Sequence, residues 1–283
     1  MTDQQHVNSA DGYDLVIKNV KVVRPGLEGT PISDVAISGG SIAKVAPEID
    51  VGGAKSVVDG QGLLAFPGLV DAHMHVGIYS PLEEDAQSES KAAAMGGVTS
   101  ALTYFRTGDY YLNKGGPYRD FYPEVLQRSQ GNYWVDYGYH LAPINRSHID
   151  EMPSLLSEHG VASFKIFMFY GGHGLHGRSS SQRNFLHLEE GESYDFAHFE
   201  FIMRKLATMI EENPERRESI SLSLHCEIAD ILNAYTAMVE KDGKLKGLHA
   251  YNAARPPHAE GLAVFIASYW PTRPGPPTST CCT

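Results

Sequence analysis

The sequence predicts an α/β protein in which a parallel sheet follows a small β unit, and two patterns support this prediction. Between residues 13 and 66, apolar and polar residues alternate in short runs rich in β-branched side chains, which indicates half-buried strands. From Gly68 onward, short apolar strands alternate with helical stretches, as is typical of βα units. Five such strands can be distinguished up to His225.

Turn residues predict how the small unit is connected. Gly39-Gly40 separates two alternating runs and fits a two-residue hairpin turn. Asp59-Gly60 separates what we predict to be a further strand pair. The unit is therefore predicted to be antiparallel.

In the parallel part, helical stretches fall between the strands. They cover residues 82–95, 124–130, 152–160 and 195–214, and a further helix covers Glu260–Tyr269. The segment Gly172–Glu192 is rich in Gly, Ser and His, and we predict a long loop there, of the kind that often serves as a lid or binding loop. Its polar residues His173, His176, Arg178 and His187 are interpreted as loop residues that shape the choice of substrate.

Composition excludes several classes of partner. The formal net charge is -11 and no Lys/Arg cluster is present, so we expect no nucleic-acid partner. No apolar run approaches the ~20 residues of a membrane span, and the polar N-terminus lacks a signal-peptide core. We therefore expect a cytoplasmic protein without a membrane partner. Three cysteines, two of them adjacent at the end, do not form a disulfide framework.

Two histidines in the first apolar strand are candidate metal ligands. His73 and His75 are separated by one residue, and residues two apart on a strand face the same side. A pair of imidazoles that converge at a strand end can form half of a metal site. The alternative is a chance pair of partly exposed histidines.

Lys165 lies in the middle of the apolar run SFKIFMFY. An ammonium group is costly to bury there, so the side chain either reaches solvent, pairs with a carboxylate, or has a functional role. The functional interpretation is that the amine reacts with carbon dioxide, because the resulting carbamate is a carboxylate that can bridge two metal ions. His225 also lies late in an apolar strand. Three strands that each deliver a ligand-type residue near their C-terminal ends match the place where parallel barrels have active sites.

The segments FPGLVDAHMHV, SFKIFMFY, LHCE and RPPHAE resemble the amidohydrolase superfamily, specifically its hydantoinase/dihydropyrimidinase branch. The resemblance covers about residues 13–269. It implies a TIM (β/α)8-type barrel with a small N-terminal β-sandwich domain, the latter in residues 1–66.

The resemblance also implies a set of site residues. His73 and His75 would bind the more buried of two divalent metal ions, Lys165 would bridge both as a carbamate, and His225 would bind the second. Tyr170 matches the tyrosine that stabilises the oxyanion in this branch. Zinc suits a histidine-rich site, with manganese or cobalt as alternatives. The segment with Arg255-Pro256 and Glu260 is interpreted as structural.

The activity that this resemblance implies is metal-assisted ring opening of a small cyclic amide, such as hydantoin, a dihydropyrimidine or a related imide, ureide or lactam. Tyr170 would donate a hydrogen bond to the oxygen as it becomes an oxyanion. An intact version is expected to be a homotetramer.

The family pattern is incomplete in this chain. Two further residues are expected, a histidine from strand six and an aspartate from strand eight, and neither is present. Residues 67–269 fall short of the ~250 residues of such a barrel, so we expect an incomplete barrel and a truncated, inactive form. Residues 270–283 form a Pro-rich tail. Its codons can be regrouped in the neighbouring frame to spell a helix end, a glycine turn and an apolar strand ending in histidine, and we interpret the tail as frameshifted.

Other hypotheses remain open on the sequence. A non-catalytic, dihydropyrimidinase-related assembly protein is one, although His73, His75, Lys165, His225 and Tyr170 are all retained. A short protein with a new role is another, but half of a parallel barrel exposes strand edges that favour aggregation. A deaminase of the same superfamily is a third, but such enzymes generally lack the bridging lysine.

Overall fold

The computed structural model describes residues 12–26, 28–168, 182–269 and 278–281, and the chain divides into two compact units. The first unit is Met1–Leu69 and the second is Val70–Thr283. In the described part of the chain, no helix combines the length and apolar character needed to cross a membrane.

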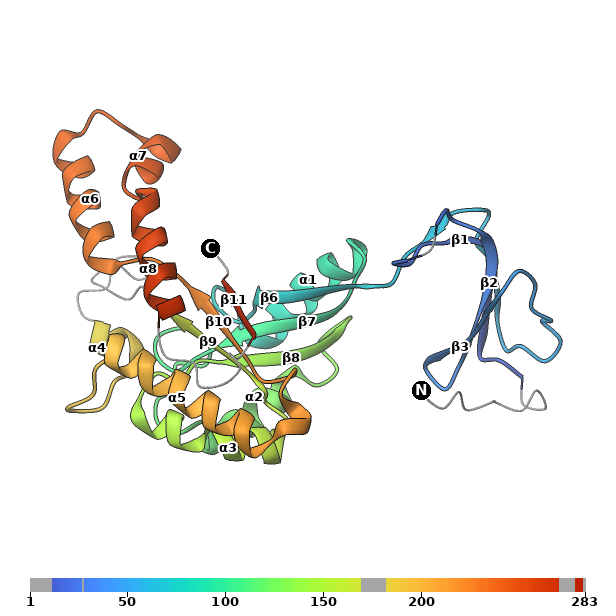
Figure 1. Cartoon of the computed structure of the whole chain (residues 1–283), viewed down its shortest axis with the longest axis horizontal. Coiled ribbons are helices and arrows are strands. Elements are labelled where there is room, and N and C mark those ends of the chain that lie inside the picture. The colour runs from blue at the N-terminus through green and yellow to red at the C-terminus, as the bar shows by residue number, and fades with distance from the viewer. Residues whose placement is uncertain (1–11, 27, 169–181, 270–277, 282–283) are drawn as a thin grey trace. The chain divides into compact units, whose positions relative to one another are not determined.

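The first unit, drawn in blue in Figure 1, is a five-stranded sheet with the order β3-β2-β1-β4, in which β5 also pairs with β1. Its strands are β1 (Leu15–Val22), β2 (Ile32–Ser38), β3 (Ser41–Ala46), β4 (Val57–Asp59) and β5 (Leu64–Ala65). Strands β1, β2 and β3 pair in antiparallel fashion. The hairpin predicted at Gly39-Gly40 is confirmed: both residues have positive φ, at 58° and 77°, which this turn type requires.

The predicted strand pair around Asp59-Gly60 is wrong. Strands β4 and β5 do not pair with each other but lie one after the other along β1, and both run parallel to it. The cause is a bulge in β1 at Asn19, whose φ is 55°. The backbone N–H groups of Gly60 and Gly62 donate to the carbonyls of Lys18 and Asn19. The turn therefore stays on the edge of β1, and the chain continues in its original direction.

A buried carboxylate ties the strands of this sheet together. Asp34 is almost fully buried, and its Oδ2 lies 2.6 Å from Nζ of Lys18. The backbone N–H groups of Asn19 and Ile49 also donate to it, at 3.0 and 2.8 Å. Burial alone would raise the pKa of Asp34, but these donors together hold it below the usual value.

The second unit contains a six-stranded sheet with the order β11-β10-β9-β8-β7-β6 (Figure 1). Its strands are β6 (Leu69–His75), β7 (Val98–Phe105), β8 (Asp136–Leu141), β9 (Ser163–Phe167), β10 (Ser221–His225) and β11 (Thr278–Cys281). Each neighbouring pair from β7 to β11 is parallel. The five strands predicted from the sequence are therefore present, and within the described residues the sheet is an open run. The segment Thr278–Cys281, within the predicted Pro-rich tail, forms a strand beside β10.

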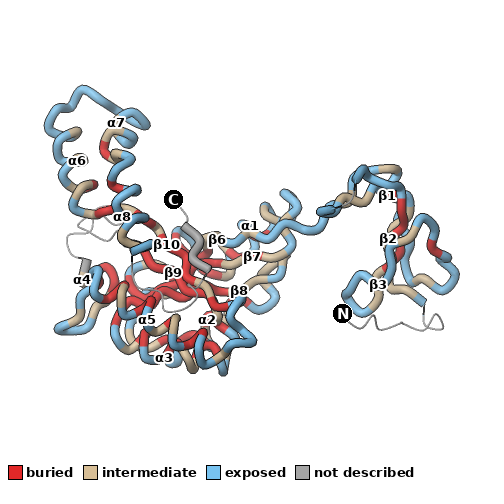
Figure 2. The backbone as a smooth tube through the Cα atoms, in the orientation of Figure 1, coloured by how far each residue is buried: buried red, intermediate tan, exposed pale blue. Residues whose placement is uncertain are grey.

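Helices follow the strands, and five of them match predicted helical stretches, whereas those over residues 182–186, 229–242 and 247–253 were not predicted. The helices are α1 (Leu82–Met95), α2 (Tyr122–Ser129), α3 (Arg146–His159), α4 (Gln182–Leu186), α5 (Phe196–Glu212), α6 (Ala229–Asp242), α7 (Gly247–Ala253) and α8 (Pro257–Tyr269). Figure 1 shows α2, α3 and α5 on one face of the sheet. Their apolar residues join those of the strands in one core cluster. Figure 2 shows buried residues concentrated in β9, β10 and the helices beside them, whereas α6 and α7 are largely exposed.

Two differences from the predicted helices have local causes. Helix α3 begins six residues before the predicted start at Met152, because the side chain of Asn145 accepts a hydrogen bond from the backbone N–H of His148 and caps the helix there. The predicted long loop 172–192 contains the short helix α4. His173, His176 and Arg178 lie outside the described residues.

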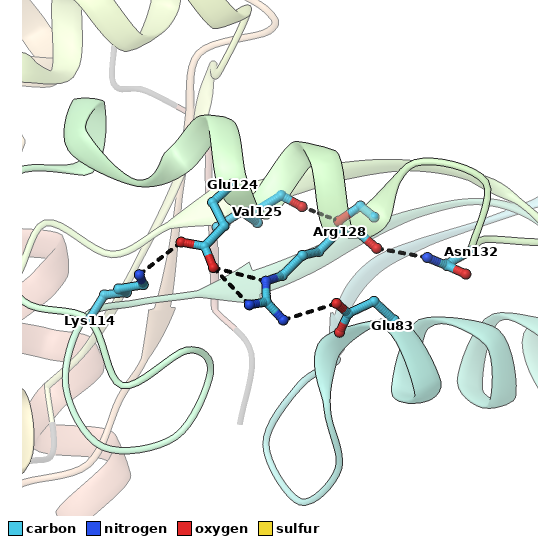
Figure 3. A network of polar contacts seen from close by, with 7 residues as sticks. Glu83, Lys114, Glu124, Val125, Arg128 and Asn132 are labelled. Atoms are coloured by element: carbon cyan, nitrogen blue, oxygen red, sulfur yellow. Dashed lines mark hydrogen bonds and ion pairs between the residues drawn. The ribbon is translucent and has the colours of Figure 1, made fainter.

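A network of ion pairs joins α1, α2 and the loop after β7 (Figure 3). Glu124 contacts Nζ of Lys114 at 2.8 Å and the guanidinium of Arg128 at 2.9 Å. Arg128 also reaches Glu83 at 3.0 Å. These side chains are about one third exposed, so solvent screens the pairs and each contributes little to stability.

We predict that Asp34→Asn destabilises the first unit by about 2 kcal/mol, because it leaves Lys18 without its counter-charge beside buried backbone donors. Because the folded-state pKa of Asp34 is lowered, this contribution is present above the unfolded pKa of about 3.8–3.9 and is lost as the pH falls through the lowered value. Amide hydrogen exchange of β1 and β2 measures the change. Asp14→Asn, which breaks the exposed pair with Lys55, is the control and should have a much smaller effect. Equal effects of the two variants would refute the role of Asp34.

Candidate metal centre

Parallel strands bring the predicted ligands to one end of the sheet. His75 and His225 are the last residues of β6 and β10, and Lys165 lies in the middle of β9. In the register of β9 with β10, Lys165 is opposite Ser223 and Phe167 is opposite His225. This is the carboxyl-terminal edge of the sheet, where parallel barrels have their sites.

Three nitrogens converge at the centre of this edge. Nε2 of His73 lies 3.1 Å from Nε2 of His75 and 3.3 Å from Nζ of Lys165. The Lys165 side chain is buried, with 1% of its surface exposed. His225 is linked to this group through Phe167, whose ring stacks on the His225 imidazole at 5.1 Å and lies 4.9 Å from the amine. The structure thus brings together four of the five residues singled out in the sequence. The fifth, Tyr170, lies outside the described residues.

Electrostatics keep His73 in its neutral form. Burial, the charge of Lys165 and the neighbouring histidines lower the pKa of His73 to about 3. Its Nδ1 is buried and has no hydrogen-bond partner in the described part of the chain. A neutral imidazole is the form that binds metal ions.

The donor set fits a metal ion if Lys165 is carboxylated. Within the described ranges, no three His, Cys, Asp or Glu side chains form a metal-binding group; the converging set is two histidines and a lysine. Nε2 of His73 lies 3.1 Å from Nε2 of His75 and 3.3 Å from Nζ of Lys165, so His73 is close enough to each of these nitrogens to share a proton or a cation with it. A carbamate on Lys165 would add the oxygen ligands that complete such a set.

Side chains that the sequence analysis missed hold the candidate ligands in place. The hydroxyl of Tyr111 lies 2.9 Å from Nδ1 of His75. Tyr111 is buried and has a left-handed φ of 50°, and its backbone N–H donates to the carbonyl of Gly77. Strained backbone of this kind persists when its surroundings enforce it, often at functional sites. No sequence pattern marks Tyr111, because it lies in a loop.

His140 is a fourth histidine at this edge. It is buried near the end of β8, with Nε2 at 2.6 Å from the carbonyl of Ala72 and Nδ1 at 2.5 Å from Oγ of Ser163. It thereby ties β8 to β6 and β9 rather than offering a ligand. Burial lowers its pKa. Its position in YGYHLAP, late in an apolar strand, is the same signal that identified His225.

Three other residues named from the sequence lie away from the candidate ligands or contact other side chains. His187 lies beside Asp109, at 3.2 Å, rather than among the candidate ligands. Arg255, interpreted as structural, contacts Glu227 at 3.5 Å. Glu260 is exposed on α8.

Comparison with known proteins finds relatives named allantoinase and D-hydantoinase. The chain is 32% identical over 253 residues to an allantoinase from Desulfitobacterium hafniense (strain Y51). The matched region covers 88% of this chain and 48% of that protein. The chain is 26% identical over 236 residues to a D-hydantoinase from Geobacillus stearothermophilus, covering 82% of this chain and 43% of the relative. The chain therefore spans about half the length of the curated relatives it matches. No family model matches the chain.

Solved structures agree. An L-hydantoinase (dihydropyrimidinase) from Arthrobacter aurescens has a TM-score of 0.67 at 19% identity, over 90% of this chain and 49% of that one. A D-hydantoinase structure has a TM-score of 0.67 at 25% identity, over 89% and 48% of the respective chains. The likeness confirms the predicted fold class, an incomplete barrel with a separate small sheet. These relatives and solved structures are hydantoinases, a dihydropyrimidinase and an allantoinase, and the similarity supports the cyclic-amidohydrolase branch of the amidohydrolase superfamily.

We predict that Lys165→Met raises the free energy of unfolding of the metal-free protein by about 1–3 kcal/mol, because an apolar side chain of similar length replaces a buried cation. Urea denaturation measures the change. Lys241→Met, at an exposed position on α6, is the control and should give no comparable gain. A loss of stability in Lys165→Met would show that the amine stabilises the fold, and would contradict the view that its burial destabilises the protein and is kept for function.

Proposed function

We propose that this chain carries the first ligands of a binuclear metal centre that hydrolyses a cyclic amide. The observation on which the proposal rests is the convergence of His73, His75 and Lys165 at the carboxyl end of parallel strands. Similarity to members of the cyclic-amidohydrolase branch supports it. Relatives that match most of this chain are named hydantoinase or allantoinase.

Two divalent ions are proposed, with zinc as the first choice because imidazole ligands suit it. His73, His75 and a carboxylated Lys165 would hold the more buried ion, and Lys165 with His225 would contribute to the second. When bound, such ions supply a water nucleophile at neutral pH and polarise the amide carbonyl. The neutral state of His73, enforced by burial, keeps its lone pair available for this role.

The protein's own groups would orient the reaction. Tyr111 fixes the His75 ring through its contact with Nδ1, which directs Nε2 toward His73. Phe167 closes the space between Lys165 and His225 with an apolar ring, which limits the access of bulk water to the amine. Tyr170 is proposed to donate a hydrogen bond from its hydroxyl group to the amide oxygen as negative charge develops there.

The substrate class is proposed to be a small cyclic ureide or imide, such as hydantoin or a dihydropyrimidine. Allantoin, the substrate named for another group of relatives, is itself a hydantoin that bears a ureido group. The product would be the N-carbamoyl or amide acid formed when the ring C–N bond breaks. A cytoplasmic location and assembly of the whole protein as a homotetramer remain part of the proposal.

The experiment is ring opening of hydantoin and dihydrouracil by the product of the full reading frame that encodes this chain, loaded with zinc or manganese. We expect hydrolysis that chelation abolishes, and a loss of at least about 100-fold in kcat/KM for His75→Ala, because a metal ligand is removed. His187→Ala, a histidine away from the candidate ligands, is the control. Metal-independent activity, or no activity with normal metal loading, would contradict the proposal; the latter would favour the non-catalytic assembly protein.

A further inference from the structure

Immediately after β10, a carboxylate contacts the candidate ligand at the end of that strand. Oε2 of Glu227 lies 2.6 Å from Nε2 of His225. Both side chains are largely buried, with 18% of His225 and 14% of Glu227 exposed. The contact is therefore shielded from solvent far more than a surface ion pair is.

The second oxygen of the same carboxylate is anchored from another part of the chain. Nε of Arg255 lies 3.5 Å from Oε1 of Glu227, and the Arg255 side chain is 28% exposed. The guanidinium lies 4.1 Å from the ring centroid of Tyr251 on α7. Arg255 is thus held against an aromatic face while it faces the carboxylate. The segment after α7 is thereby connected to the end of β10.

We propose that Glu227 is a positioning residue that fixes the tautomer and ring orientation of His225 for metal binding, with Arg255 as its anchor. This inference rests on the proposed function. A neutral imidazole whose Nε2–H donates to a carboxylate has its lone pair on Nδ1, so Nδ1 is the nitrogen that presents to a metal ion. Carboxylates that accept a hydrogen bond from a ligating histidine in this way also increase its basicity as a ligand.

Packing on the ring explains why the carboxylate is needed. Phe167 stacks on the His225 imidazole with an interplanar angle of 28°, which restrains the plane of the ring. Stacking does not distinguish the two ring nitrogens, because a ring flip leaves the plane unchanged. Glu227 supplies that distinction through its contact with one nitrogen. Plane and tautomer are thus set by two different residues, from β9 and from the segment after β10.

The first test is the tautomer of His225 in metal-free protein, measured by two-bond ¹H–¹⁵N spectra of ¹⁵N-histidine-labelled chain at a pH above the usual histidine pKa of about 6.5. We expect His225 to be protonated on Nε2 in the unsubstituted chain. Glu227→Leu should give a mixture of tautomers. Glu227→Gln, whose amide oxygen can still accept the same hydrogen bond, should restore the Nε2–H form.

The second test is zinc affinity of the 283-residue chain, measured by competition with a chromophoric chelator. Glu227→Leu should weaken zinc binding about 10- to 100-fold, as loss of a histidine's carboxylate partner typically does. Arg255→Met should weaken it less, because the carboxylate remains. Glu124→Leu removes a carboxylate from the network in Figure 3 and is the matched control. It should leave both the tautomer and the affinity unchanged.

The outcomes separate this inference from the proposed function. An unchanged His225 tautomer and an affinity within a factor of two in Glu227→Leu would overturn the positioning role, even if the unsubstituted chain binds zinc well. If the unsubstituted chain binds no zinc, the proposed metal centre fails, while the tautomer measurement still decides whether Glu227 sets the ring. If Glu227→Leu does not fold, the other two variants decide. The inference is supported if His225 carries its proton on Nε2 in Glu227→Gln and zinc affinity falls in Arg255→Met. It is refuted if Glu227→Gln gives a mixture of His225 tautomers and Arg255→Met binds zinc with unchanged affinity.

Discussion

The candidate site depends on the burial of one amine in a strand that has no exposed residue. All five residues of β9 are buried, and Lys165 is the central one. The desolvation penalty of a buried ammonium is several kcal/mol, a large part of the stability of a typical domain. The amine lies 3.3 Å from one histidine and close to an aromatic ring. Neither group supplies a negative charge, whereas carboxylation would remove the positive charge and add a metal ligand.

Parallel strand geometry accounts for the rest of the convergence. Each strand contributes its last residues to the same edge, so ligands distant in sequence meet without any contact along the chain. His75 ends β6 and His225 ends β10, while β9 places Lys165 beside them. His140 ties three of these strands to one another. The sheet therefore fixes the ligands more rigidly than loops could, which a preorganised metal site requires.

Periodicity and turn chemistry predicted the strands of the first unit and strands β6 to β10 of the second, because these have apolar patterns, whereas β11, in the Pro-rich tail, was not predicted. The hairpin at Gly39-Gly40 followed from a turn that needs positive φ at both residues. The sequence misled at Asp59-Gly60, where a bulge at Asn19 keeps the turn on the edge of β1. Such a bulge depends on tertiary pairing and has no local signature. The start of α3 was missed for a simpler reason: Asn145 is a helix cap, and its residue type was a visible signal.

The candidate site was predictable where ligands lie on strands. His73, His75, Lys165 and His225 stood out because polar, ligand-type residues interrupt apolar runs. Tyr111 and Arg255 lie in connections, and no rule of periodicity links them to His75 or to Glu227. Their roles became visible only through distances. Glu227 was only partly predictable. It follows His225 by two residues, as His75 follows His73, but its carboxylate contacts the His225 ring and is not among the candidate metal ligands.

X-ray absorption at the zinc edge of the zinc-loaded chain tests the central claim most directly, since it reports which atoms bind the ion. We expect nitrogen and oxygen neighbours at about 2.0–2.2 Å, with imidazole scattering that diminishes in His73→Ala and His75→Ala. Sulfur neighbours at about 2.3 Å would instead assign the ion to the cysteines. Such a spectrum, or imidazole scattering unchanged in both variants, would contradict the proposed metal centre.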